Sequence, residues 1–141
     1  MGKAWFITGT DTNAGKTFVS AGLARALKRR GLSTGVMKPV ETGCPTVGGM
    51  LAPKDAIILK EASGTKDPID LINPFRFILP LAPLMAAEEE GRAIEPATIK
   101  TVFETIRASH AATIVECAGG LLVTVTRDMT MADIALLLDI P

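Results

Sequence analysis

The sequence predicts a single α/β domain in which helices cover both faces of a parallel β-sheet. Apolar, strand-like segments alternate along the chain with segments of helical periodicity, and this alternation is typical of parallel sheets. Of the 141 residues, 48% are hydrophobic, which suits strands that are buried on both faces. A glycine-rich turn at residues 9–17 separates the first expected strand from the first expected helix and is the most informative stretch of the chain.

Each expected element follows from a local pattern. The second strand is ended by Pro39, which cannot donate a ladder hydrogen bond. The first helix carries cations in its last turn, where they complement the helix dipole, and Gly31 ends it. Strands are expected at residues 4–8, 34–38 and 113–116, with a further candidate at 121–125. Helices are expected at residues 17–30, 54–62, 81–90, 96–110 and 131–138, and irregular loops at 41–53 and 63–80.

The glycine-rich turn reads Gly-Thr-Asp-Thr-Asn-Ala-Gly-Lys-Thr. A turn of this kind between a strand and a helix binds phosphate, because its backbone N–H groups and the positive end of the helix point at phosphate oxygens. Lys16 is expected to reach the β- and γ-phosphates, and the Thr17 hydroxyl to bind Mg²⁺. The usual pattern has glycine where Thr10 stands, so the flanking strand and helix carry the prediction. The alternative is an ordinary helix N-terminus capped by Thr or Asn.

Three strand ends are expected to meet beside this turn. The carboxyl ends of parallel strands open onto one crevice, where ligands gather. Glu116 ends the third expected strand, and an acid there typically holds the Mg²⁺ of a nucleotide. Lys38 ends the second strand and can stabilise a second anion beside the γ-phosphate, while Asp55 can add an oxygen ligand. The alternatives are solvated strand-end charges and, for Asp55, an acid that complements its helix dipole.

Composition excludes several classes of function. The formal net charge is zero and aromatic residues make up 4% of the chain, so neither nucleic acid nor a membrane is an expected partner. Cys44 and Cys117 fit no zinc pattern. No Ser/His/Asp or Cys/His constellation is recognised, and His110 is expected near a helix C-terminus or on the surface, without a partner. The N-terminus lacks a signal-peptide pattern and no apolar run is long enough to span a membrane, so a cytoplasmic protein is expected.

Several motifs, in one order along nearly the whole chain, resemble the dethiobiotin synthetase family. They include the turn with its shifted first glycine, Met-Lys-Pro-Val-Glu-Thr-Gly and Glu-Cys-Ala-Gly-Gly-Leu-Leu-Val. The resembling segments are residues 9–17, 37–43, 72–75, 80–83, 116–123 and 130–133. The resemblance implies a P-loop NTPase-like sheet with helices on both faces.

The resemblance also implies an ATP- and Mg²⁺-dependent ligase of biotin biosynthesis. One amine of 7,8-diaminopelargonate (7,8-diaminononanoate) reacts with CO₂ to give a carbamate, whose oxygen attacks the γ-phosphate of ATP. The second amine then closes the ring of dethiobiotin and expels phosphate. Two anions must approach each other, so the chemistry requires positioning and cations in the crevice. The implied partners are the diamine, CO₂ or bicarbonate, ATP and, at full length, a second copy of the chain.

Carried onto this sequence, the resemblance assigns roles to particular residues. Lys16 and Lys38 are the implied catalytic residues, and Thr12, Lys38 and Thr42 the implied substrate-binding residues. Thr17, Asp55 and Glu116 are the implied magnesium ligands. The implied ATP-binding residues are Asn13, Ala14, Gly15, Lys16, Thr17, Phe18, Asp55, Glu116, Cys117, Ala118 and Gly119.

The family continues well beyond the length of this chain. We therefore expect residues 1–141 to be one nucleotide-binding α/β domain that forms the N-terminal portion of a longer one. The further part normally supplies the Asn that recognises adenine and much of the dimer contact. One alternative is a non-catalytic, nucleotide-binding regulatory module of the same fold. Another is a related amidoligase that activates a carboxylate with ATP, although the glutaminase domain of that family is absent here.

Overall fold

A computed structural model of the chain describes residues 2–10 and 15–141. The central sheet has three strands in the order β1-β7-β2, formed by β1 (Lys3–Ile7), β7 (Ala112–Glu116) and β2 (Thr34–Met37). All of its neighbours are parallel, with Ile114 opposite both Trp5 and Val36. The roles expected for Thr12, Asn13 and Ala14 lie outside the described residues.

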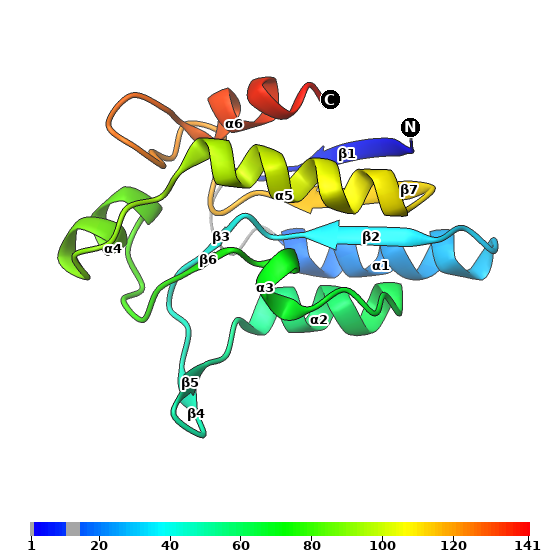
Figure 1. Cartoon of the computed structure of the whole chain (residues 1–141), viewed down its shortest axis with the longest axis horizontal. Coiled ribbons are helices and arrows are strands. Elements are labelled where there is room, and N and C mark those ends of the chain that lie inside the picture. The colour runs from blue at the N-terminus through cyan, green and yellow to red at the C-terminus, as the bar shows by residue number, and fades with distance from the viewer. Residues whose placement is uncertain (1, 11–14) are drawn as a thin grey trace.

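Helices cover both faces of this sheet, as the sequence predicts (Figure 1). Helices α1 (Lys16–Arg29) and α2 (Lys54–Ser63) lie side by side on one face, and α5 (Pro96–Ser109) and α6 (Met131–Leu138) lie on the other. Successive side chains of a strand point to opposite faces. Ile114 accordingly belongs to the core beneath α1 and α2, whereas Val115 belongs to the core beneath α5 and α6. The central strand is therefore buried along its whole length, including Thr113 and the Glu116 that ends it.

The second strand ends one residue earlier than expected, and this places Lys38 beyond the sheet. Pro39 has no N–H to continue the ladder. The Lys38 N–H instead donates to the carbonyl of Ile72 at 2.8 Å, and the chain turns into β3 (Val40–Glu41). Strand β3 pairs in parallel with β6 (Phe75–Arg76).

The two segments expected to be irregular contain short elements. Residues 41–53 form an antiparallel hairpin of β4 (Thr46–Val47) and β5 (Met50–Leu51), which projects away from the sheet in Figure 1. Residues 63–80 contain α3 (Ile69–Ile72) and β6. Elements of two to four residues bury too little apolar surface to leave a periodic pattern in the sequence.

The strand candidate at residues 121–125 is wrong. Only an isolated antiparallel bridge joins Thr124 to Thr130. The carbonyls of Leu121 and Val123 instead accept hydrogen bonds from the first turn of α6, at Ala132 and Met131. Leu121 is exposed, so its apolar side chain was not evidence of a buried strand.

Two helices illustrate how local chemistry fixes helix ends. Helix α6 begins where predicted, because Thr130 and Asp133 form a capping box that satisfies two orphan N–H groups. Helix α4 (Pro83–Glu89) begins two residues later than expected, at a proline whose missing N–H costs nothing in the first turn. Beyond α6, the carbonyl of Pro141 accepts from the N–H of Phe6 at 2.7 Å. Within the described residues, no helix is both long and apolar enough to cross a membrane.

Candidate functional site

Charged side chains gather at the carboxyl end of the sheet. Glu116 is the last residue of β7, Lys38 follows β2, and Thr17 lies in the first turn of α1, which follows β1 along the chain. The Thr17 hydroxyl donates to Glu116 Oε1 at 2.8 Å, and Lys38 Nζ lies 3.5 Å from Glu116 Oε2. The structure therefore brings together side chains that are up to 99 residues apart in the sequence.

Lys38 is buried among acceptors. Its Nζ lies 3.1 Å from Asp55 Oδ2 and 3.4 Å from the carbonyl oxygen of Cys117. Burial by itself would lower the pKa of Lys38, but attraction by the Glu116 and Asp55 carboxylates outweighs it, so the pKa is raised above its ordinary value. Lys38 is therefore a fixed positive charge throughout the neutral pH range.

One oxygen of Glu116, Oε2, accepts no hydrogen bond from the described residues and faces the Lys38 ammonium group at 3.5 Å. The residue is fully buried, and burial raises the pKa of its carboxyl above the ordinary value, despite the opposing effects of Lys38 and the Thr17 hydroxyl. No hydrogen bond reaches Oε2 within the described part of the chain. A buried oxygen without such a bond costs free energy unless a cation or water compensates it.

A buried carboxylate oxygen that accepts no hydrogen bond from the described residues fits a bound Mg²⁺, which prefers carboxylate, hydroxyl and phosphate oxygens. The Thr17 hydroxyl and the Asp55 carboxylate are the other expected ligands near Lys38 and Glu116. Among the described residues, no group of three or more His, Cys, Asp and Glu side chains could hold a metal by itself. The donor set therefore suits an ion that retains waters and phosphate oxygens.

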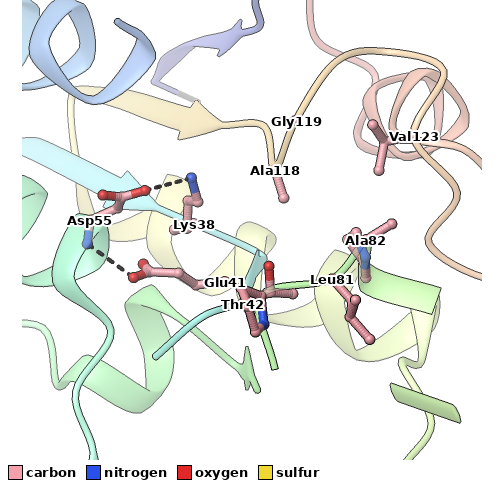
Figure 2. Close-up of a pocket in the computed structure, with 11 residues that line it drawn as sticks. Lys38, Glu41, Thr42, Asp55, Leu81, Ala82, Ala118, Gly119 and Val123 are labelled. Carbon is pink, nitrogen blue, oxygen red and sulfur yellow. Dashed lines mark hydrogen bonds and ion pairs between the residues drawn. The ribbon is translucent and has the colours of Figure 1, made fainter. Parts of the chain in front are cut away.

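Sequence reasoning missed Glu41, a buried acid in the same site. Its two carboxylate oxygens accept hydrogen bonds from the backbone N–H groups of Asp55 and Ala56, each at 3.0 Å, at the start of α2. Figure 2 shows the bond from Asp55. Burial raises the pKa of Glu41, although these two hydrogen bonds act in the opposite direction. The sequence carried a usable signal for such an acid. Pro53 precedes α2 and its side chain cannot cap the helix, so the first N–H groups of α2 need an acceptor from elsewhere in the chain.

A cavity of about 280 Å³ opens beside these charges. One wall is polar, and Figure 2 shows Thr42 on it beside Glu41. The facing wall is apolar and comes from the segment before α4 and from the loop after β7. The polar lining is Lys38, Glu41, Thr42 and Asp55, and the rest is Pro80, Leu81, Ala82, Pro83, Ala118, Gly119 and Val123. Neither composition nor periodicity marked this apolar wall.

The loop after β7 closes the cavity through its backbone. Gly119 has φ +69°, and a Cβ there would stand 2.7 Å from Val123 Cγ2, so a side chain is excluded on both counts. Cys117 is buried, and burial raises the pKa of its thiol. Ala118 and Gly119 line the cavity, whereas Cys117 contributes its carbonyl to Lys38.

The start of α1 supplies the remaining expected residues. Gly15 is the N-cap of α1, and Lys16 is buried in its first turn. The side chain of Phe18 is 86% exposed. Phe18 can therefore contribute only its backbone to a phosphate at this helix end.

The structure corrects one expectation outside this site, since His110 has two partners. Its Nε2 lies 2.7 Å from Asp67 Oδ2 and its Nδ1 lies 2.8 Å from Ser33 Oγ. A carboxylate only accepts, so Nε2 carries a proton, and in the neutral ring Nδ1 then accepts from the Ser33 hydroxyl. A Ser/His/Asp cluster thus exists, contrary to the sequence analysis, at the amino end of the strands.

This cluster fits a structural link between three segments. Ser33 precedes β2, His110 precedes β7 and Asp67 lies between α2 and α3. Gly35 makes room for the imidazole ring, because a Cβ there would meet His110 Cδ2 at 2.7 Å. The carboxyl ends of α1, α2 and α5 also point toward this end of the sheet, and their partial negative charge disfavours anionic intermediates.

The parallel sheet, the Gly-Lys-Thr at the start of its first helix and the acid that ends β7 define a P-loop NTPase-like, nucleotide-binding α/β protein. Residues 3–141 match the model of a family described as AAA domain, and the chain belongs to that family.

Three curated relatives share one name. Proteins named ATP-dependent dethiobiotin synthetase from Anaeromyxobacter dehalogenans (strain 2CP-C) and Aromatoleum aromaticum are 46% and 42% identical to it, over 96% and 99% of this chain. A protein of that name from Methanocaldococcus jannaschii is 40% identical over 92% of the chain. The chain spans 59%, 62% and 58% of these relatives' own lengths.

Proposed function

We propose that this chain carries out, as part of a dethiobiotin synthetase, the ATP- and Mg²⁺-dependent carboxylation and ring closure of 7,8-diaminopelargonate. The observation that carries the proposal is the buried Lys38 between Asp55 and Glu116, at the phosphate-binding end of the sheet and beside a partly apolar cavity. The shared name of the relatives supports the choice of reaction. ATP is the proposed co-substrate.

Lys38 supplies the charge that the chemistry needs. Its pKa is raised, so it is cationic when a carbamate and a γ-phosphate, both anionic, approach each other. Electrostatic stabilisation of this kind is typically the largest single contribution to catalysis. Lys16, buried at the start of α1, binds the phosphates in this proposal.

Thr17, Glu116 and Asp55 would hold Mg²⁺, which when bound neutralises phosphate charge and orients the γ-phosphate. Glu116 Oε2 has no competing hydrogen bond among the described residues, and Thr17 is within hydrogen-bond distance of the same carboxylate. The backbone of residues 15–18 and 117–119 would lie against the nucleotide.

The cavity suits a substrate that combines amines with an alkyl chain. Thr42 and Lys38 on its polar wall would receive the reacting amine and its carbamate, and the apolar wall at residues 80–83 and Val123 would contact methylene groups. Burying apolar surface stabilises a bound ligand by about 25 cal/mol per Å². Thr12 belongs to the proposed substrate set as well. A full-length homodimer and a cytoplasmic location remain part of the proposal.

A non-catalytic nucleotide-binding module is the second candidate. It is supported by the match to the family model, whose description names a domain and no reaction. Such a module would bind Mg²⁺–ATP through the same residues and turn over no diamine.

An omission assay separates the two candidates. ADP release is measured with Mg²⁺–ATP, bicarbonate and 7,8-diaminopelargonate, and each component is then left out in turn. The enzyme requires both the diamine and CO₂ for ADP release. Binding of Mg²⁺–ATP with no diamine-dependent release identifies the module instead, and ADP release that ignores the diamine contradicts the proposed reaction.

A further inference from the structure

We propose that Glu41 is a positioning residue that caps α2 and thereby holds Asp55 against Lys38. The magnesium requirement of nucleotide binding would then depend on Glu41, although Glu41 itself touches no ligand. This inference rests on the proposed function, because the role of Asp55 in holding Mg²⁺ belongs to it. Two contacts carry the inference. One oxygen of Glu41 accepts a hydrogen bond from the backbone N–H of Asp55 itself, and the other accepts one from that of Ala56, both in the first turn of α2.

Helix α2 lacks a cap of its own. The first N–H groups of a helix have no partner within it, and a side chain at the N-cap usually accepts from the second or third helical residue. Here the N-cap is Pro53, whose side chain accepts nothing. Asp55 and Ala56 are the second and third residues of α2, and Glu41 accepts from them across 14 and 15 residues of sequence.

A carboxylate is the group that fits this arrangement. The two N–H donors face two different oxygens of Glu41, each at 3.0 Å. An ionised carboxylate only accepts, whereas an amide presents an NH₂ group to one of the two donors. The negative charge also lies at the positive end of the α2 dipole. Glu41→Gln therefore removes half of the cap while keeping the volume.

The cap joins the segment that carries Lys38 to the start of α2, which carries Asp55. Glu41 lies three residues after Lys38, whereas the chain between Glu41 and Asp55 leaves the site and forms the β4–β5 hairpin. Val47 and Met50 at the tip of that hairpin are exposed, so the hairpin does not position Asp55 by packing. The hydrogen bonds of Glu41 instead join the start of α2 to the segment that carries Lys38.

Glu41 acts through Asp55 rather than on the ligand. Both of its oxygens are engaged by backbone N–H groups, and the residue is 6% exposed. The side chain of Asp55 is 38% exposed and bonds to Lys38 at 3.1 Å (Figure 2). Of the two acids, Asp55 is thus the one able to reach an ion in the cavity.

A double-mutant cycle tests this inference. Mg²⁺ is titrated against the 141-residue chain at fixed ATP, and binding is followed by calorimetry, with inorganic tripolyphosphate as a probe that needs no adenine recognition. Glu41→Gln and Asp55→Asn are each expected to raise the half-saturating Mg²⁺ concentration by about tenfold, which corresponds to about 1.4 kcal/mol. The double variant is expected to equal Asp55→Asn alone, because both changes remove one function.

A rescue and a control complete the experiment. Pro53→Ser in the Glu41→Gln background offers α2 a local cap and is expected to restore most of the Mg²⁺ response. Glu95→Gln changes an acid at the N-cap of α5, outside the lining of the cavity, and is expected to change nothing. Thermal melting of each variant shows whether it is folded.

The outcomes distinguish the two proposals. Suppose that the wild-type chain binds Mg²⁺ with ATP or tripolyphosphate. If the effects of Glu41→Gln and Asp55→Asn on the half-saturating Mg²⁺ concentration then multiply in the double variant, the positioning role is overturned and the proposed function is not. An unchanged Mg²⁺ response in Glu41→Gln also overturns the positioning role, as does a folded Glu41→Gln/Pro53→Ser variant without recovery. A wild-type chain that binds neither probe overturns the proposed function, and the positioning role with it.

Discussion

At the scale of single residues, the site places one buried cation between a buried and a partly exposed acid. Lys38 contacts Asp55 and Glu116, and both Lys38 and Glu116 are buried. Removing one partner of such a cluster leaves the opposite charge uncompensated, which is costly in a protein interior. The cluster is therefore sensitive to every substitution that changes its charge.

Lys38→Ala is expected to abolish turnover, with a loss of at least about 10³-fold in kcat, because Lys38 is the cation proposed to lie between the two approaching anions. Lys16→Ala is expected to abolish turnover as well. Steady-state ADP release in a full-length protein measures both effects. Lys100→Ala, an exposed lysine on α5, serves as the control with a normal rate. Near-normal rates in Lys38→Ala or Lys16→Ala would remove that residue from the mechanism.

Glu116→Gln is expected to raise the relative thermal stability of the protein at neutral pH and, at the same time, to abolish Mg²⁺-dependent binding. The pKa of Glu116 is raised in the folded state, chiefly by burial, so the folded state binds its proton more tightly than the unfolded state does. The contribution of Glu116 to stability therefore falls as the pH rises above its ordinary pKa. Gln stays neutral, so the melting temperature of Glu116→Gln relative to wild type should rise between pH 4 and pH 7, while Mg²⁺-dependent binding is lost. A relative melting temperature that falls over this range would contradict the burial argument.

At the scale of elements, the sequence analysis missed two side chains that link distant segments by hydrogen bonds. Glu41 caps α2 from another strand, and His110 links β2, α5 and the α2–α3 connection. Both depend on tertiary proximity, and neither leaves a periodic pattern. By contrast, the capping box of α6 is local, and the bounds of that helix were predicted correctly.

His110→Ala is expected to lower the free energy of unfolding by about 1–2 kcal/mol, because it removes two hydrogen bonds that are worth about 1 kcal/mol each. For a domain of this size that corresponds to a melting temperature lower by several degrees. Ser109→Ala is the matched control, since Ser109 precedes His110 in the chain and its hydroxyl donates to the Thr105 carbonyl within α5. Mg²⁺–ATP binding should be unchanged in both variants. Loss of binding in His110→Ala would show that the cluster serves the site.

At the scale of the whole molecule, the fold and the charged part of the site were predictable, but the cavity was not. Alternating strands and helices indicated the parallel sheet, and the rule that its carboxyl ends converge brought Lys38 and Glu116 together. The apolar wall at residues 80–83 comes from a segment whose packing depends on β6 and α4. No rule of spacing places such a segment opposite Thr42.

The central claim is that Thr17 and Glu116 hold a metal-bound triphosphate beside Lys38. The most direct test is a crystal structure of the protein with Mn²⁺, in place of Mg²⁺, and a non-hydrolysable ATP analogue, in which anomalous scattering locates the ion. The account predicts an ion bonded to Thr17 Oγ1, at about the 2.0–2.2 Å typical of small divalent ions, with Glu116 Oε2 bonded directly or through one water and Lys38 Nζ facing the γ-phosphate. An ion bound elsewhere, or phosphates turned away from Lys38, would contradict it.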